Sequence, residues 1–277
     1  MRNRHVLITG GSSGIGLALA LRCAAAGARL SLVARDPAKL AAAAAEIRAT
    51  APAASSPPAI VTAPADVADE TALHAAIRSA EATHGPVDIL ITSAGIARPG
   101  HFDELSAAIH ERTMAVNYFG TLHAIRAVTP SMRARRTGSI VIMSSGCGLV
   151  GLFGYTAYAP SKFALRGLAE SLRGELAPDN VGVTIVYPPD TDTPQLAQEN
   201  LTKPAETRAL TAAAGLWTAD AVARATLDGL RRGRFSITPG LQLTALSWFH
   251  SLLAPVLRWS FDRTAARAQR DAPSRNK

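Results

Sequence analysis

The chain has 277 residues, of which 48% are hydrophobic and 18% are charged, which suits one α/β domain with a sizeable core. Its two cysteines, Cys23 and Cys147, exclude a disulfide framework, and without a histidine cluster we expect no bound metal. The net charge is +8, but six basic and two acidic residues within 258–277 supply half of this excess, so we expect no nucleic-acid partner.

The first predicted element is a short buried strand over residues 6–8. Because it begins so near Met1, we expect no signal peptide and an intracellular, cytoplasmic protein. A glycine-rich turn follows and leads into an apolar helix that ends near Ala26. This order is typical of dinucleotide sites, where glycines admit a pyrophosphate and the helix N-terminus attracts its charge. The predicted cofactor contacts here are Thr9, Gly10, Ser12, Ser13, Gly14, Ile15 and Gly16.

The second predicted strand, over residues 30–34, ends at Arg35. An NAD site usually has a carboxylate near this position, whereas an arginine suits the 2′-phosphate of NADP. Lys39, one helical turn later, adds a second positive charge, and Asp36 is expected to cap the following helix. The sequence therefore predicts NADP(H) as the cofactor.

Strands and helices continue to alternate beyond this point. We predict a helix over 38–50, a Pro/Ser-rich insertion over 52–58, a strand over 60–62, a helix over 70–84 and a strand over 87–91. Four strands alternating with helices predict a doubly wound parallel sheet that binds ligands at its carboxyl edge. After the third and fourth strands, the expected cofactor contacts are Asp66, which can accept from the adenine amino group, Val67, Ala94 and Gly95.

The candidate reaction centre lies within residues 142–167. A predicted strand over 139–143 ends next to Ser145, and a later helical segment carries Tyr158 and Lys162. Residues at i and i+4 share one helix face, so the phenol and the ammonium are expected in one pocket. The cation is expected to lower the pKa of Tyr158, while Ser145 holds a substrate oxygen. This trio predicts proton transfer to or from a carbonyl or alcohol oxygen.

Over residues 4–193 the chain resembles the short-chain dehydrogenase/reductase family. The likeness rests on Thr9-x-x-x-Gly14-x-Gly16, Asp66-Val67, Ala94-Gly95, Asn117, Ser145 and Tyr158-x-x-x-Lys162. It implies a Rossmann-type sheet with helices on both faces and a catalytic tetrad of Asn117, Ser145, Tyr158 and Lys162. In this family Lys162 would also bind the nicotinamide ribose. The resemblance adds Pro188, Thr191 and Thr193 to the expected cofactor contacts.

Asn117 falls within a helix that we predict over residues 106–129. By resemblance, it holds a water that links Lys162 to a proton relay. The alternative is a polar residue in mid-helix that bonds to its own helix.

The loop over residues 187–194 narrows the resemblance to one group within the family. The family usually has Pro-Gly-x-x-x-Thr here, whereas this chain has Pro189 in place of the glycine. The strings at 187–194, 199–207 and 151–154 resemble the 3-ketodihydrosphingosine reductases of sphingolipid synthesis. This likeness implies NADPH-dependent reduction of the 3-keto group of a long-chain amino ketone to sphinganine. Two alternatives stay open: a reductase of another apolar ketone, such as a steroid or fatty acyl ketone, and a non-catalytic NADP-binding protein at a membrane.

The last part of the chain suggests contact with lipid. After a predicted helix over 220–231 and a strand over 235–238, the segment 241–261 is apolar and contains Trp248 and Trp259. No run reaches the ~18 uninterrupted apolar residues of a spanning helix. Tryptophans followed by arginines suit a pair of interfacial helices on a membrane surface. A lid over the pocket or an oligomer contact is the alternative.

We therefore expect two units in the chain. Residues 1–240 form the NADP-binding catalytic domain, including a substrate loop over 188–215, and residues 241–277 form the apolar, basic extension. The family resemblance also implies a homodimer or homotetramer assembled through the helices that carry Asn117 and Tyr158.

Overall fold

A single parallel sheet forms the centre of the computed structural model, which describes residues 1–50, 58–212 and 215–271. The strand order within these residues is β3-β2-β1-β4-β5-β6-β9, and every neighbouring pair is parallel. The strands are β1 (His5–Thr9), β2 (Arg29–Ala34), β3 (Ile60–Pro64), β4 (Ile89–Thr92), β5 (Gly138–Met143), β6 (Val181–Val186) and β9 (Ser236–Ile237). The predicted doubly wound parallel sheet is confirmed. The Pro/Ser-rich insertion lies outside the described residues except for Pro58.

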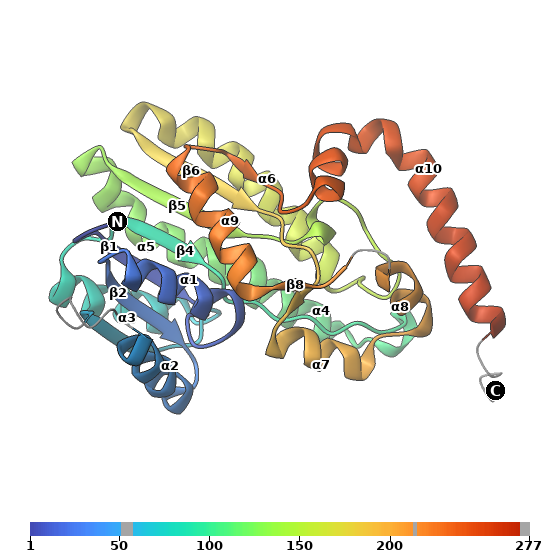
Figure 1. Ribbon diagram of the computed structural model, residues 1–277, viewed down its shortest axis with the longest axis horizontal. Helices are drawn as coiled ribbons and strands as arrows, with labels where there is room; N and C mark the ends of the chain where they lie inside the picture. Colours follow the sequence, from blue (N-terminus) through green and yellow to red (C-terminus); the bar gives the residue numbers. More distant parts are fainter. Residues whose placement is uncertain (51–57, 213–214, 272–277) are drawn as a thin grey trace.

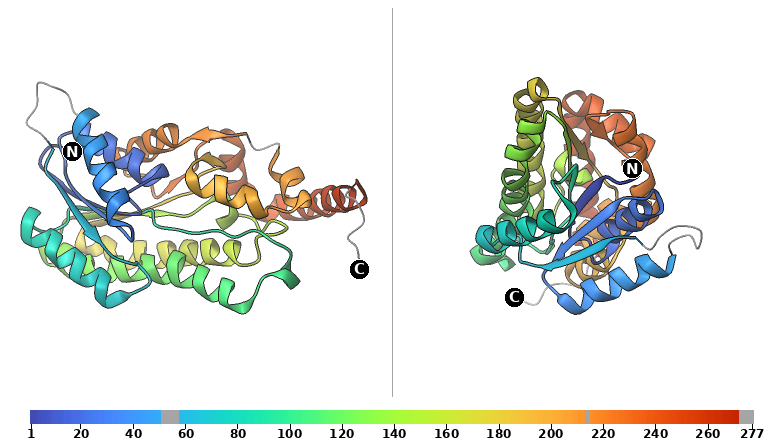
Figure 2. Two further views of the ribbon diagram at one scale, coloured as in Figure 1. Left: turned by 90° about the horizontal axis from the view of Figure 1, so that it is seen from below. Right: turned by 90° about the vertical axis from the view of Figure 1, so that its left-hand side faces the viewer.

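Helices cover both faces of the sheet, as Figure 2 shows. One layer consists of α1 (Gly14–Ala25), α2 (Pro37–Thr50) and α9 (Ala219–Arg231), and the other of α3 (Glu70–His84), α5 (Gly120–Arg135) and α6 (Tyr158–Leu176). A strand covered on both faces must be apolar on both, because its side chains alternate between them. In β1, Leu7 joins one core while Val6 and Ile8 join the other. This is why the strands are continuous apolar runs.

The chain reverses its winding direction at β1. It passes from β1 through β2 to β3 and then returns to place β4 on the other side of β1. Ligands in open α/β sheets bind at such a reversal, outside the carboxyl ends of the strands. The first turn of α1 begins at Gly14, directly after β1. As expected, Asp36 caps α2, since its Oδ1 accepts from the backbone N–H groups of Ala38 and Lys39 at 2.9 and 3.2 Å.

The helix predicted over 106–129 is not continuous. α4 (Ala107–Met114) passes into a π-helical turn, η2 (Ala115–Phe119), before α5 begins. Asn117 lies in the middle of this turn. Turns of this kind frequently occur at functional sites. Apolar spacing alone does not reveal the wider winding, so the sequence could not predict it.

Residues 188–212, within the segment expected to form a substrate loop, contain structure that the sequence did not predict. They contain β7 (Thr191–Asp192), which pairs with β8 (Trp217–Thr218), and the helices α7 (Pro194–Thr202) and α8 (Ala205–Thr211). Thr193 starts α7, because its hydroxyl accepts from Leu196 N–H at 3.3 Å and Pro194 occupies the first turn. Short helical turns complete the described chain at η1 (Phe102–Glu104), η3 (Gly146–Gly148) and η4 (Ala177–Asp179).

The apolar extension forms one helix, α10 (Leu241–Asp271), and the expected helix pair is wrong. Pro255 lies inside it, and Figure 1 shows α10 bending before it runs beside α8 along the outside of the molecule. Thr244 holds the first turn of α10 in place, since its single hydroxyl hydrogen is shared between the carbonyl oxygens of Thr238 and Gly240, which accept at 3.1 and 2.9 Å. Leu243 lies against the loop after β5, 3.1 Å from where a Cβ on Gly146 would be. Among the described residues, no helix has both the length and the apolar character needed to cross a membrane.

Candidate active site

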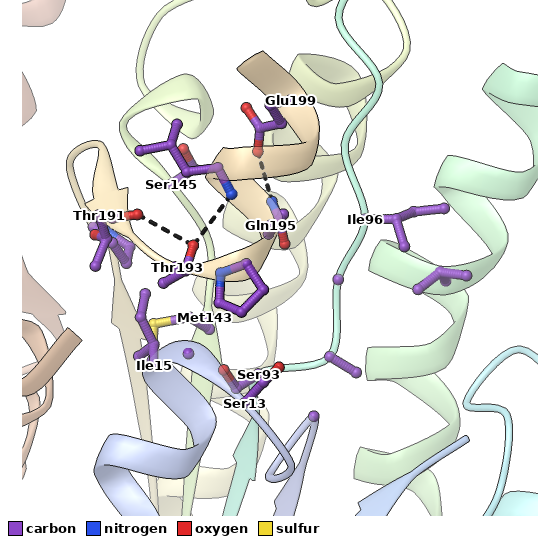
Figure 3. A pocket seen from close by; sticks show the side chains of 18 of the residues that line it. Ser13, Ile15, Ser93, Ile96, Met143, Ser145, Thr191, Thr193, Gln195 and Glu199 are labelled. Carbon is purple, nitrogen blue, oxygen red and sulfur yellow. Dashed lines mark hydrogen bonds between the residues drawn. The ribbon is translucent and has the colours of Figure 1, made fainter. Parts of the chain in front are cut away.

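A cavity of about 310 Å³ opens at the carboxyl edge of the sheet (Figure 3). Its walls come from the loops after β1 to β6 and from α7. It brings together most of the residues predicted from sequence: Gly10, Ser12, Ser13, Gly14, Ile15, Arg35, Lys39, Asp66, Val67, Ala94, Gly95, Ser145, Tyr158, Lys162, Pro188, Thr191 and Thr193. Three predicted residues, Thr9, Gly16 and Asn117, support the walls without lining the cavity.

The glycine turn after β1 is packed too tightly for side chains. A Cβ on Gly10 would lie 2.7 Å from Ala94 N, and one on Gly16 would lie 2.2 Å from the carbonyl oxygen of Gly10. Ser13 precedes α1 without bonding the first-turn N–H groups through its side chain. These groups can therefore face an anion at the helix N-terminus. The turn fits the pyrophosphate of a dinucleotide.

Thr9 holds the neighbouring loop in place. Its hydroxyl accepts from Ala94 N–H at 3.4 Å, and its carbonyl accepts from Ser93 N–H at 3.0 Å. These bonds join the ends of β1 and β4 beneath the cavity. Thr9 thus shapes the site from behind.

Charged side chains lie at the end of the cavity near β2 and β3. Arg35 and Lys39 are exposed at its wall, where a 2′-phosphate would find two cations. Asp66 is already engaged, since Oδ2 accepts from Arg112 at 2.5 Å and Oδ1 from Ala68 N–H at 3.0 Å. Burial opposes its charge, but these bonds outweigh it and hold the pKa of Asp66 below its usual value.

Tyr158 and Lys162 project from the first turns of α6 and are both buried. The Lys162 ammonium donates to the Met143 carbonyl at 3.0 Å and lies 5.5 Å from the centroid of the Tyr158 ring. Burial lowers the pKa of Lys162 to about 8. The predicted pair therefore does share one pocket.

The expectation that Lys162 lowers the pKa of Tyr158 is wrong for this arrangement. Burial raises the pKa of Tyr158 well above its usual value, and the charge of Glu199 raises it further. Contacts with Ser145 and Gln195 act in the opposite direction but do not compensate. The phenol is consequently neutral, which is the form that donates a proton.

The two serines after β5, Ser144 and Ser145, have different roles. Ser144 is buried and donates to the Lys162 carbonyl at 3.0 Å, which ties the end of β5 to α6. Ser145 is partly exposed at the cavity, where its hydroxyl accepts from Cys147 N–H at 3.2 Å. Because the oxygen is held by that N–H group, the hydroxyl is placed next to Tyr158.

Asn117 connects three parts of the site. Its amide accepts from Ile96 N–H at 2.9 Å and donates to the Ile96 carbonyl at 3.0 Å. It also donates to Ser161 Oγ at 2.9 Å, and Ser161 donates to the Tyr158 carbonyl at 2.7 Å. The local alternative for the Asn117 side chain is therefore wrong. Its bonds fix the loop after β4 and the first turn of α6 relative to each other.

Among the lining residues that were not predicted as site residues, Tyr155, Gln195 and Glu199 form a hydrogen-bonded group. Tyr155 donates to Glu199 Oε2 at 2.7 Å, and Gln195 donates to Glu199 Oε1 at 2.9 Å. Gln195 and Glu199 are four residues apart on α7, so they share one helix face. The i,i+4 spacing of Gln195 and Glu199 was not interpreted as a helix face, because residues 188–215 were expected to form a loop.

Comparisons with known proteins agree with this geometry. The family model described as short chain dehydrogenase matches residues 4–204. The 3-dehydrosphinganine reductase of Danio rerio is 42% identical over 251 residues, covering 89% of this chain and 75% of that protein. The 3-ketodihydrosphingosine reductase of Bos taurus is 42% identical over 253 residues, covering 91% and 76%.

Two solved structures share the fold. Levodione reductase superposes with a TM-score of 0.79 at 26% identity, covering 88% of this chain and 99% of that one. A short-chain dehydrogenase from Sphingobium yanoikuyae in complex with NADPH superposes with a TM-score of 0.75 at 28% identity. The match covers 99% of this chain and 98% of that one.

Proposed function

The chain belongs to the short-chain dehydrogenase family, and from this membership we propose that it is an NADPH-dependent reductase of 3-ketosphinganine that forms sphinganine. The observation that carries the chemistry is the neutral phenol of Tyr158 beside the Lys162 ammonium in one buried pocket. The observation that carries the substrate is the 42% identity to reductases named for this amino ketone. NADPH is the cofactor named in the structure of a similar dehydrogenase.

The cofactor would be held by the glycine turn at its pyrophosphate, by Arg35 at its 2′-phosphate and by Lys162 at its nicotinamide ribose. When bound, it supplies a hydride for the carbonyl carbon of the substrate. Tyr158 donates a proton to the carbonyl oxygen, and the Ser145 hydroxyl hydrogen-bonds that oxygen as charge develops on it. Asn117 positions Tyr158 through Ser161.

The function is tested by the loss of NADPH absorbance when 3-ketosphinganine is added to the purified protein. Parallel reactions contain NADH in place of NADPH, or a steroid ketone in place of the amino ketone. We expect rapid oxidation of NADPH with the amino ketone. If only the steroid ketone were reduced, the protein would still be a reductase, but the proposed substrate, 3-ketosphinganine, would be wrong.

Replacing Arg35 by serine is expected to change the choice of cofactor. Removing the guanidinium takes away a charge-assisted contact to the 2′-phosphate, which NADH lacks. We expect kcat/KM for NADPH to fall about 20-fold while that for NADH stays within about threefold. Initial rates over a range of both cofactors measure this ratio. Equal losses with both cofactors would contradict the role of Arg35.

Because the proposed substrate is a lipid, we also propose that α10 contacts the cytoplasmic surface of a membrane. Its exposed apolar side chains are Leu241, Trp248, Phe249, Leu252, Leu253, Val256 and Trp259. Basic side chains follow along the same helix at Arg258, Arg263, Arg267 and Arg270. Exposed tryptophans next to arginines suit the interface of an anionic bilayer. Such a helix lies on the membrane surface without crossing it.

Replacing Trp248 and Trp259 together by serine is expected to weaken vesicle binding. Their side chains are 78% and 59% exposed, so the change should leave the fold intact. Each ring withdrawn from lipid is expected to lower the partition coefficient about tenfold. Co-sedimentation with vesicles containing anionic lipid measures this. Leu201→Ser on α7, at a residue that is 74% exposed, is the control and should bind as the parental protein does.

Assembly into two or four copies through the helices that carry Asn117 and Tyr158 remains part of the proposal. The same holds for the division into a catalytic domain over 1–240 and an extension over 241–277. Light scattering of the purified protein with and without α10 would test both.

A further inference from the structure

Glu199 places a buried carboxylate in the wall of the active-site cavity. It lies on α7 and is only 7% exposed. Both of its oxygens accept hydrogen bonds, one from the Tyr155 hydroxyl at 2.7 Å and one from the Gln195 amide at 2.9 Å. Figure 3 shows Gln195 and Glu199 side by side at the cavity. Two donors on two oxygens suit the ionised form of the carboxyl group.

This carboxylate has neutral hydrogen-bond partners. Within residues 1–50, 58–212 and 215–271, no lysine, arginine or histidine forms a direct ion pair with Glu199. Burial lowers the pKa of Lys162 and the charge of Glu199 acts in the opposite direction, so these two buried groups interact, but without direct contact. The other buried acid on this side of the molecule, Glu206, lies 3.7 Å from His101, and Asp190 lies 3.5 Å from Lys203. A buried charge whose direct partners are all neutral is incompletely compensated, which is unfavourable. Glu199 is therefore set to accept a cation from a ligand.

The carboxylate is also close to the reacting groups. The rings of Tyr155 and Tyr158 are 5.6 Å apart, and Tyr155 bonds Glu199 directly. A Cβ on Gly95 would lie 3.8 Å from Gln195 Oε1 and 3.7 Å from Lys162 Nζ, so both side chains border the same spot. The charge of Glu199 contributes to the raised pKa of Tyr158, which reflects the same proximity. A substrate carbonyl at Tyr158 thus has a negative charge nearby.

An amino ketone carries its ammonium group on the carbon next to the carbonyl carbon. We infer that Glu199 binds this ammonium and so selects amino ketones over neutral ketones of the same length, an inference that rests on the function proposed above. Tyr155 and Gln195 orient the carboxylate. The cation from the substrate compensates the buried charge, and the short spacing places the ketone at Tyr158.

The test compares two ketones with the parental protein and with Glu199→Gln. One is 3-ketosphinganine and the other is the same long-chain ketone without its amino group, each reduced with NADPH. The glutamine keeps the shape of the side chain and a carbonyl acceptor for Tyr155 while removing the charge. Glu206→Gln is the matched control, because Glu206 is equally buried at 5% exposed but does not line the cavity.

We expect the parental protein to prefer the amino ketone at least about tenfold in kcat/KM. Glu199→Gln should lower kcat/KM for the amino ketone about 50-fold and change that for the neutral ketone by less than about threefold. Glu206→Gln should leave the ratio between the two ketones unchanged. Thermal melting checks that each variant folds. If Glu199→Gln does not fold, the inference is decided by whether the parental protein prefers the amino ketone to the neutral ketone.

Three results overturn the inference while the function stands: equal parental rates on both ketones, equal losses on both in Glu199→Gln, or the same change of ratio in Glu206→Gln. If the parental protein reduces a steroid ketone but neither long-chain ketone, the proposed function fails instead. The two failures are therefore distinguishable.

Discussion

Tyr158→Phe is expected to lower kcat for ketone reduction about 1,000-fold. The phenol is the proton donor in the proposed reaction, and its raised pKa keeps it protonated at neutral pH. Phenylalanine fills the same space on α6 but has no proton to give. Because the backbone carbonyl of residue 158 still accepts from Ser161, the first turn of α6 should stay in place. Stopped-flow or initial-rate measurement of NADPH oxidation gives the loss.

The control for this change is Tyr118→Phe, which removes a phenol from the π-helical turn outside the cavity. Its kcat should match that of the parental protein. The affinity of Tyr158→Phe for NADPH, measured by thermal melting, should be close to that of the parental protein. If Tyr158→Phe reduced the substrate at the parental rate, Tyr158 would not be the acid.

Gly16→Ala is expected to have the largest effect on cofactor binding and on stability together. The new methyl group would lie 2.2 Å from the carbonyl oxygen and 2.8 Å from the carbonyl carbon of Gly10. Both are backbone atoms, so the whole turn must move. Overpacking of this kind destabilises by about 3 kcal/mol, which lowers the melting temperature of a chain of this length by about 5 °C. Because the turn would no longer fit the pyrophosphate, kcat/KM for NADPH should fall about 100-fold.

Gly174→Ala is the matched control for this prediction. Gly174 is exposed on α6, and a Cβ there would meet nothing within 4 Å. Alanine in an exposed helix interior is favoured over glycine by about 1 kcal/mol, so this variant should melt no lower than the parental protein and keep its activity. If Gly16→Ala behaved in the same way, close packing against Gly10 would not shape the cofactor site.

The doubly wound parallel sheet and the position of the pocket at its carboxyl edge could be predicted because they follow from local patterns. The glycine turn after β1, Arg35 after β2 and the i,i+4 pair on α6 are each short in sequence and lie at the ends of predicted elements. Parallel strands bring such ends to one edge. The cavity does gather Arg35, Tyr158 and Lys162.

Other features depend on contacts between distant residues and could not be predicted. The direction of the pKa shift of Tyr158 is set by burial and by Glu199, which is 41 positions away in a segment expected to be a loop. The π-helical turn at Asn117 is held by bonds to Ile96 and Ser161, which lie on other elements. The segment beyond residue 240, expected to be a helix pair, is one helix, since α10 continues through Pro255 to Asp271.

The anchoring of α10 against the loop after β5 bears on how a water-insoluble substrate reaches the pocket. Leu243, at the root of the helix, touches the loop that carries Ser145, while the exposed tryptophans lie further along the same helix. Every methylene that leaves a bilayer for water costs about 0.8 kcal/mol, so full hydration of ten of them would cost about 8 kcal/mol. In the proposed arrangement, with α10 on the bilayer surface and its first turn against the loop that carries Ser145, the acyl chain would move a short way into the pocket, and most of it would never be hydrated at once.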